Sequence, residues 1–431
     1  MKAIVVSIGD ELVLGQTVDT NSSWLSRELA SVGIAVVEHI TVADDSAAIE
    51  AAISGAAMRC DLLLINGGLG PTKDDLTREA LTRALNAPLE LNADWLRRLE
   101  SFFAQRGRPM PQTNRVQAMI PRGARLLDNT AGTAPGIDAD FTGGGTSRSC
   151  RIFAMPGVPS EMKLMFQKSV LPHLAQMGAG TDAGTDAGAV ILSGTLHTFG
   201  VGESTIGEQL GDLMDRRRNP SVGTTVSSGV VSVRINARFA HRDAARAELE
   251  QTAGLCRDAL GDLIYGSDEQ TLASVVADLL TADKVRTVAT AESCTGGLLA
   301  KMLTDIPGSS GYFQKGWITY SNQAKTELLD VAPQLLAQDG AVSESVVRAM
   351  AQTARQKSAA DFALAISGIA GPDGGTPAKP VGTVCIALAH AQSVLARTFH
   401  FPGDRQTIRD RSAKMALTLL RFHLLGKPAP F

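Results

Sequence analysis

Residues 291–297 carry a candidate nucleophile in the string AESCTGG of this 431-residue chain. Ser293 follows an apolar stretch and precedes a helical one. Its hydroxyl is therefore expected at the carboxyl edge of a sheet, where backbone N–H groups can stabilise an oxyanion. A serine nucleophile needs a base, and no histidine is near in sequence. Lys325, 32 residues on, can accept a proton if burial lowers its pKa, and Tyr320 is a further donor.

The local string also supports simpler interpretations. Taken alone, it favours Ser293 as a helix N-cap and Cys294 as a small buried core residue. A third interpretation makes Cys294 the nucleophile. A cysteine nucleophile usually has a histidine partner, and the sequence shows no obvious one.

Two later segments could complete a site around Ser293. Residues 367–375 follow a strand and contain four glycines, which suits a loop that surrounds a phosphate. Arg405 stands at a helix start and could bind that phosphate or face solvent. Arg409, one turn later, is interpreted as part of a solvated helix face.

Three other loops combine glycines with carboxylates at expected strand ends, namely residues 9–11, residues 67–75 and residues 155–161. Glycines let a backbone approach a phosphate, and nearby carboxylates suit a divalent cation that bridges to it. The simpler interpretation is a tight turn at residues 67–70, with Asp74 and Asp75 capping a helix. The loop lacks the Gly-Lys-Ser/Thr of a Walker A motif and the third glycine of a dinucleotide fingerprint.

Strand and helix signals alternate on both sides of these loops, which predicts α/β domains with mainly parallel sheets. The expected domains are residues 1–172, a small α+β module at 173–266, and a second α/β domain at 267–431. Strands are expected at 3–8, 34–41, 61–65, 152–155, 190–193, 230–239, 286–291, 317–321, 362–367 and 382–389. Helices are expected from about residue 20 to 33 and at 46–58, 74–85, 159–166, 244–260, 272–280, 295–303, 343–357 and 408–425. The low-complexity residues 178–188 are expected to be a linker, and the glycine run 143–145 a loop.

Composition narrows the function classes. Lys+Arg 41 against Asp+Glu 44 gives a net charge of −3, and aromatic residues are 4%, so direct nucleic-acid binding is not expected. The sequence contains no apolar run long enough for a membrane helix, and its five scattered cysteines favour neither a disulfide framework nor a zinc site. A cytoplasmic protein is expected.

The motifs GDELVLGQTVDTN, GGLGPTKDDLT, MPGVPSEM and NTAGTAPG resemble the molybdopterin-binding-type domain of the CinA (competence/damage-inducible protein) family. The resemblance covers essentially the whole chain, with Asn66 where the family more often has Thr. It implies hydrolysis of the pyrophosphate bond of ADP-ribose with a divalent metal ion (Mg, Mn or Co). The candidate metal ligands or bases are Asp10, Glu11, Asp74, Asp75 and Glu161. The candidate ligand-binding residues are Gly67, Gly68, Gly70, Thr72, Pro156 and Gly157.

The strings AESCTGG, ITYSNQAK, SGIAGPDGG, KPVGTV and GDRQTIR resemble the C-terminal domain of the same family, which is similar to stand-alone nicotinamide-nucleotide amidohydrolases. This implies hydrolysis of nicotinamide mononucleotide to nicotinic acid mononucleotide and ammonia, with no cofactor. Ser293 would be the nucleophile, Lys325 the base, and Tyr320 a relay or oriented donor. The residues expected to contact substrate are Thr295, Gly296, Ser367, Gly368, Gly371 and Arg405.

Three hypotheses follow. The first is a pyridine-nucleotide recycling enzyme that acts on both substrates. The second is a non-catalytic nucleotide- or pterin-binding regulatory protein linked to competence or DNA damage. The third, a molybdopterin-handling protein, leaves Ser293 and Lys325 unexplained. The resemblance also suggests a homodimer.

Overall fold

The computed structural model describes residues 1–142, 149–176 and 190–430. The expected linker at 178–188 and the glycine run at 143–145 lie outside the described residues. Contacts divide the chain into two compact units, Met1–Ser193 with Asn236–Glu250, and Gly194–Ile235 with Gln251–Phe431.

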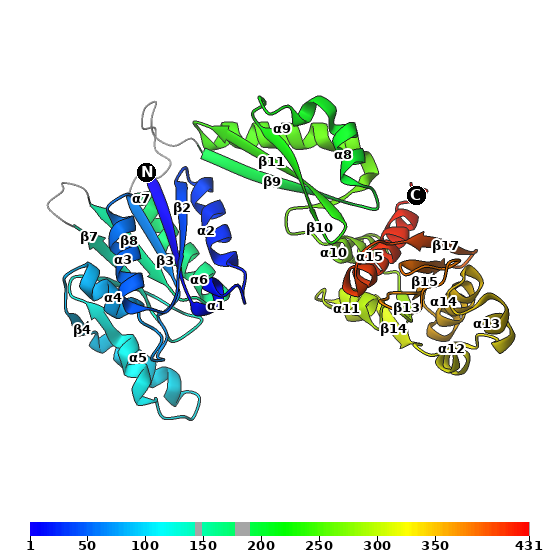
Figure 1. The fold of residues 1–431 in the computed structure, drawn as a ribbon, viewed down its shortest axis with the longest axis horizontal. Coiled ribbons are helices and arrows are strands. Elements are labelled where there is room, and N and C mark those ends of the chain that lie inside the picture. Colours follow the sequence, from blue (N-terminus) through cyan, green and yellow to red (C-terminus); the bar gives the residue numbers. More distant parts are fainter. Residues whose placement is uncertain (143–148, 177–189, 431) are drawn as a thin grey trace. The chain divides into compact units, whose positions relative to one another are not determined.

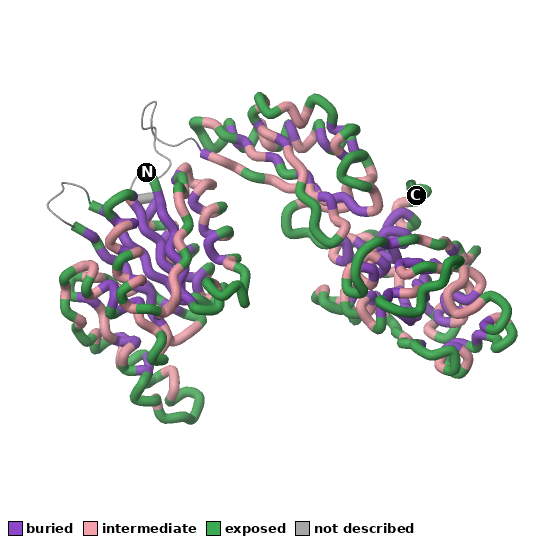
Figure 2. The backbone as a smooth tube through the Cα atoms, in the orientation of Figure 1, coloured by how far each residue is buried: buried purple, intermediate pink, exposed green. Residues whose placement is uncertain are grey.

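A six-stranded sheet forms the centre of the N-terminal segment, in the order β2-β1-β3-β8-β7-β6 (Figure 1). β1, β2, β3 and β8 pair in parallel, and β7 and β6 extend the sheet antiparallel. The strands are β1 (Lys2–Ile8), β2 (Ala35–Val42), β3 (Leu62–Asn66), β6 (Arg125–Leu127), β7 (Gly136–Phe141) and β8 (Cys150–Met155). β1 and β3 are apolar and buried along almost their whole length (Figure 2), as expected for central parallel strands covered on both faces.

Helices cover both faces of this sheet because alternate residues of a strand point to opposite sides. Ala3 and Val5 belong to one apolar core with α2 and α6, whereas Ile4 and Val6 belong to a second core with α3 and α4. The helices are α1 (Asp10–Val13), α2 (Thr20–Ser31), α3 (Ser46–Ala57), α4 (Thr77–Ala84), α5 (Ala93–Ala104), α6 (Pro159–Met165) and α7 (Leu171–Gln176). The sequence did not reveal α5, β6, β7 or the small pair β4 (Leu89–Leu91) and β5 (Met119–Pro121).

The middle segment forms a four-stranded sheet in the order β10-β11-β9-β12, with two helices. Its elements are β9 (Val190–Phe199), α8 (Glu203–Leu210), β10 (Ser221–Ser227), β11 (Val230–Phe239), α9 (Arg242–Leu260) and β12 (Ile264–Ser267). β9 runs six residues beyond the expected strand, and β10, β12 and α8 were not expected from the sequence.

The C-terminal segment has a five-stranded sheet in the order β14-β13-β15-β16-β17, parallel between β14, β13 and β15 and antiparallel beyond. Its strands are β13 (Val288–Glu292), β14 (Phe313–Ile318), β15 (Phe362–Gly368), β16 (Thr383–Ala389) and β17 (Val394–His400). The helices are α10 (Leu272–Thr281), α11 (Leu298–Thr304), α12 (Asn322–Leu329), α13 (Pro333–Asp339), α14 (Glu344–Ser358) and α15 (Arg405–Leu424). One core joins the sheet to α10, α11 and α15, and another joins it to α14, so the expected α/β class is confirmed.

Two helices begin three residues later than the sequence predicted, and both differences lie beside candidate sites. α4 begins at Thr77 rather than Asp74, because the Asp75 carboxylate accepts the N–H groups of Gly70 and Thr72 and holds a turn there. α11 begins at Leu298 rather than Thr295, because Gly296 and Gly297 adopt positive φ values of 57° and 93°.

Candidate functional sites

Ser293 is the first residue of a tight turn, residues 293–297, that joins β13 to α11 (the nucleophile turn). Its own N–H donates to the carbonyl of Ile366 on the neighbouring strand β15, at 2.9 Å. The position of the serine is therefore fixed by the sheet rather than by the loop alone.

The carboxylate of Glu292 caps α11. It accepts the backbone N–H groups of Gly297, Leu299 and Ala300 at 3.0, 3.0 and 2.8 Å. The N-cap position of α11 is Gly297, so the interpretation of Ser293 as a helix cap is wrong. Glu292 was not identified from the sequence. Although it adjoins Ser293, the sequence AESCTGG does not distinguish it from an ordinary strand residue.

Lys325 lies on α12 with its side-chain nitrogen directed at the nucleophile. Its Nζ is 3.0 Å from Ser293 Oγ and 2.9 Å from the carbonyl oxygen of Thr319. Lys325 is only 1% exposed and Ser293 8% exposed. Burial lowers the pKa of Lys325, against a smaller opposing effect of Cys294, and so increases the neutral fraction that can act as a base. The geometry brings together the two residues that the sequence paired.

Cys294 is buried beside this pair, but its thiol is not in the ionised form that a cysteine nucleophile needs. Burial raises the pKa of its thiol to about 12, so the thiol stays protonated at neutral pH. A Cβ on Gly368 would lie 3.1 Å from its sulfur, which shows how closely the thiol packs against that backbone. Cys294 is therefore better explained as a packing residue than as a nucleophile.

Tyr320 and Arg405 form a second pair at the exposed rim. Arg405 donates to the Tyr320 hydroxyl at 2.7 Å and to the carbonyl of Gly371 at 2.8 Å. Tyr320 is 59% exposed, and no hydrogen bond connects it with Ser293 or Lys325 in the described residues. This arrangement suits contact with a substrate better than a proton relay.

Arg409 is not on a solvated face, so its interpretation from the sequence was wrong. It donates to the carbonyl oxygen of Thr295 at 2.7 Å and thereby ties α15 to the nucleophile turn. Ser367 is buried, and its hydroxyl donates to Ala341 O at 2.7 Å. Among the described residues, the N–H group of Thr295 has no assigned protein acceptor and that of Cys294 interacts only with its own thiol, which leaves these two as the donors of the turn that could face an oxyanion.

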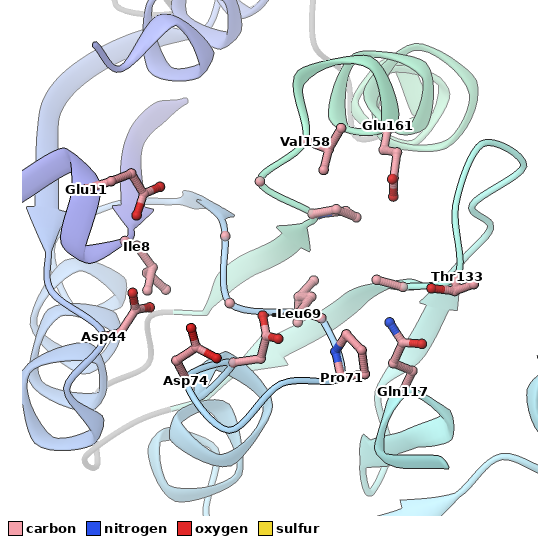
Figure 3. Close-up of a pocket in the computed structure, with 18 residues that line it drawn as sticks. Ile8, Glu11, Asp44, Leu69, Pro71, Asp74, Gln117, Thr133, Val158 and Glu161 are labelled. Carbon is pink, nitrogen blue, oxygen red and sulfur yellow. Dashed lines mark hydrogen bonds between the residues drawn. The ribbon is translucent and has the colours of Figure 1, made fainter. Parts of the chain in front are cut away.

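A cavity of about 440 Å³ opens where β1, β3 and β8 end in the N-terminal segment. It is lined by residues of all three glycine-containing loops, including Gly67, Gly68, Gly70, Pro156 and Gly157. Pro71 lines the cavity, but the neighbouring Thr72, which was expected to bind the ligand, does not. Figure 3 is a close-up of the cavity, with Glu11, Asp44 and Asp74 on one side of Leu69 and Glu161 on the other.

The five carboxylates expected in this region have different surroundings. Glu11, Asp74, Asp75 and Glu161 line the cavity, but Asp10 does not. Asp10 and Asp44 instead accept each other's backbone N–H groups, at 2.9 and 3.0 Å. Glu161 accepts a hydrogen bond from Asn129 at 2.7 Å. Both Asp75 oxygens already bind Gly70 and Thr72.

Asp44 lines the cavity and was missed. Burial, then the negative charges of Asp10, Glu11 and Asp74, raise the pKa of its carboxyl. Asp44 lies two residues after the end of β2, so its position at a strand end could have found it, although no glycine accompanies it there.

These carboxylates suit a divalent cation only in part. Among the described residues, no group of three or more His, Cys, Asp or Glu side chains is arranged to hold a metal ion. Mg²⁺ in phosphate sites is commonly held by one or two carboxylates together with phosphate oxygens. The residues present therefore fit a cation that arrives with a phosphate ligand and is held by one or two of the lining carboxylates Glu11, Asp44 and Asp74.

Comparisons with known proteins cover the same segments. Family models match at residues 4–176 (probable molybdopterin binding domain), 193–266 (damage-inducible protein CinA KH domain) and 269–424 (CinA C-terminal domain). A "Putative competence-damage inducible protein" of Symbiobacterium thermophilum is 44% identical, covering 99% of this chain and 99% of its own length. The chain belongs to the CinA family. A CinA-like protein of Geobacter sulfurreducens is 41% identical, over 99% of this chain and 100% of its own.

Solved structures of the family match smaller parts of the chain. The competence/damage inducible protein CihA of Agrobacterium tumefaciens is 40% identical and covers 36% of this chain and 93% of its own, with a TM-score of 0.34. The CinA protein of Thermoplasma acidophilum is 29% identical and covers 41% of this chain and 98% of its own, with a TM-score of 0.35. In the described part of the chain, no helix is both long and apolar enough to cross a membrane.

Proposed function

We propose that the C-terminal segment is a serine amidase that hydrolyses nicotinamide mononucleotide to nicotinic acid mononucleotide and ammonia. The observation that carries this proposal is the buried pair of Lys325 Nζ and Ser293 Oγ, 3.0 Å apart. The match of residues 269–424 to the CinA C-terminal domain is compatible with this reaction. The choice of substrate rests on the resemblance of the motifs around Ser293, Lys325 and Arg405 to those of nicotinamide-nucleotide amidohydrolases.

The reaction takes place in two steps. Neutral Lys325 accepts the Ser293 proton, and Oγ forms a bond to the carboxamide carbon. The C–N bond then breaks, and the proton on Lys325 goes to the leaving nitrogen, which departs as ammonia. Water attacks the resulting ester, Lys325 takes a proton from it, and that proton returns to Ser293 as the acid is released.

The rim residues supply the binding groups for the rest of the nucleotide. The guanidinium of Arg405 suits a phosphate group of the substrate. Tyr320, whose hydroxyl contacts Arg405, can donate a hydrogen bond to the nucleotide or stack on one of its rings. The N–H groups of Cys294 and Thr295 are the donors for the oxyanion.

The test is ammonia release from nicotinamide mononucleotide by the full chain, without and with EDTA. Ser293→Ala should abolish release, whereas Cys294→Ala, the neighbouring thiol, should retain it. Release that survives EDTA and disappears only in the serine variant supports the amidase. No release from the wild-type chain, or release unchanged by Ser293→Ala, would refute it.

A second activity, hydrolysis of the pyrophosphate bond of ADP-ribose, is proposed for the N-terminal cavity. The specific observation is a cavity that combines a glycine loop with carboxylates on both sides. A divalent cation, when bound, would neutralise phosphate charge and activate water. One or two of the lining carboxylates Glu11, Asp44 and Asp74 would hold it together with phosphate oxygens, and residues 67–70 would hold the phosphates.

The measurement is the release of AMP from ADP-ribose with Mg²⁺, Mn²⁺ or Co²⁺ in turn. Asp74→Asn should lower this rate strongly. Asp94→Asn, an exposed carboxylate on α5 that pairs with Arg97, is the matched control. Equal rates in both variants would argue against a role for Asp74.

A further inference from the structure

The glycine-rich loop, residues 67–70, has all four of its carbonyl oxygens occupied by two consecutive residues at the start of α4. Thr77 takes the first two carbonyls and Arg78 the other two. The bonds run from Thr77 Oγ1 to Gly67 O at 2.8 Å, from Thr77 N to Gly68 O at 3.2 Å, from Arg78 Nη2 to Leu69 O, and from Arg78 Nη1 to Gly70 O at 3.1 Å. The whole backbone of the loop is thus oriented from one side.

Arg78 places a positive charge in the protein interior directly behind this loop. It is only 1% exposed, and its Nε has no hydrogen-bond partner among the described residues. Burial lowers its pKa to about 10, opposed by the charge of Asp75, so the guanidinium remains protonated at neutral pH. A buried charge of this kind is costly and needs compensation, which the loop carbonyls supply in part.

The peptide N–H groups of the loop face the opposite way. In a planar trans peptide the C=O and N–H point in opposite directions, so carbonyls turned toward Thr77 and Arg78 leave the N–H groups of Gly68 and Leu69 pointing away from them. No protein acceptor is assigned to either N–H in the described part of the chain. Both residues line the N-terminal cavity.

The neighbouring contacts restrict the loop further. Gly70 N donates to Asp75 Oδ1 at 2.7 Å, so this amide is not free for a ligand. A Cβ on Gly68 would lie 2.3 Å from Thr77 Oγ1, and one on Gly70 would lie 2.4 Å from Asp75 Oδ2. A side chain at either position would therefore have to displace Thr77 or Asp75, the residues that hold the loop, and Gly68 also has a positive φ of 64°.

We propose that Thr77 and Arg78 are positioning residues that hold the loop as an anion site, with the N–H groups of Gly68 and Leu69 as its donors for one phosphate group of the ligand. Neither side chain is needed in contact with that ligand. The inference rests on the proposed second activity only in requiring a phosphate-bearing ligand, and it does not require that the ligand is hydrolysed.

The test uses methylenediphosphonate, a pyrophosphate analogue that cannot be hydrolysed, titrated calorimetrically into the full chain with and without Mg²⁺. Thr77→Val removes one hydroxyl at nearly constant volume, and we expect affinity to fall about fivefold. Arg78→Met removes two donors and the charge, and we expect a loss of tenfold or more. Thr77→Ser and Arg78→Lys should restore much of the affinity.

Thr82→Val is the matched control, because Thr82 Oγ1 donates to Arg78 O at 2.9 Å on the same helix and does not touch the loop. Its affinity should equal that of the wild-type chain. Thermal unfolding identifies variants that fail to fold, and if Arg78→Met is one of them, Thr77→Val decides the question.

Two results would overturn the inference, and they are distinguishable. If the wild-type chain binds the analogue and folded Thr77→Val and Arg78→Met bind it equally well, or folded Thr77→Val alone does where Arg78→Met does not fold, the positioning role is wrong while the phosphate ligand stands. If the wild-type chain does not bind the analogue with or without Mg²⁺, the anion site and its positioning residues both fail.

Discussion

Glu292→Gln is the substitution that most directly tests how the nucleophile is held. The Glu292 carboxylate accepts three backbone N–H groups, two at Oε2 and one at Oε1. In glutamine one of these oxygens becomes an NH₂ group, which faces a donor instead of accepting from it. The less costly orientation keeps the oxygen at the two-bond position and loses the bond from Ala300.

The expected loss of stability follows from that single bond. A hydrogen bond to a charged group contributes about 1.5–3 kcal/mol, so we expect the free energy of unfolding to fall by about 2 kcal/mol. For a unit of this size that corresponds to a melting temperature lower by about 4–8 °C. Ser293 is the next residue, and a displacement of about 1 Å costs about a hundredfold in rate, so kcat should fall about tenfold to a hundredfold.

The assay is ammonia release from nicotinamide mononucleotide, with thermal unfolding measured on the same preparations. KM should change little, because the rim residues that bind the nucleotide are not altered. Glu327→Gln, an exposed carboxylate on α12 that accepts from Gln323, controls for the loss of one negative charge. A Glu292→Gln variant with wild-type kcat and melting temperature would refute the role assigned to this carboxylate.

The remaining predictions concern the same site. Only neutral Lys325 can accept the Ser293 proton, and burial lowers the pKa of Lys325, so kcat/KM should rise with pH around a midpoint below the pKa of an exposed lysine. A midpoint equal to the pKa of an exposed lysine would count against Lys325 as the base. Lys325→Met should lower kcat about a hundredfold or more, and near-normal turnover would exclude proton transfer through this residue. Cys294→Ala should keep kcat within about threefold, because its thiol is protonated, and thiol-alkylating reagents should not inhibit the wild-type chain at neutral pH. Arg409→Met should lower kcat about tenfold in the ammonia assay, since it loses the bond to Thr295 O, and Arg409→Lys should lose less.

Much of the α/β architecture could be predicted from the sequence because its strands are short apolar runs that end in glycine-containing turns. β1 and β3 lie within one residue of their expected bounds. The elements that were missed, such as β6, β10 and β17, are short or polar on one face and have no comparable pattern. Their pairing depends on neighbours far away in the chain.

The candidate sites also combine residues with a local sequence signal and residues whose role depends on distant contacts. The strand-end position of Ser293 made it a candidate, although the local string alone favoured a helix cap, and the pairing of Ser293 with Lys325 as nucleophile and base came from the family resemblance. Arg409 was not, because its partner Thr295 is 114 residues earlier and helical spacing does not reveal which turn a side chain meets. Thr77 and Arg78 were missed for a different reason: a buried arginine has the same appearance in a sequence as an exposed one.

The two sites also differ in how far apart along the chain their supporting contacts lie. Every bond between the glycine-rich loop and Thr77, Arg78 or Asp75 spans 5 to 10 residues. Ser293, in contrast, depends on Lys325, 32 residues away, and on Ile366 in another strand. Because closing a short segment costs less chain entropy, the glycine-rich loop should reach its shape early in folding, whereas Ser293 is fixed in place only once β15 has paired with β13. Recovery of the proposed amidase activity during refolding would then report completion of the C-terminal sheet.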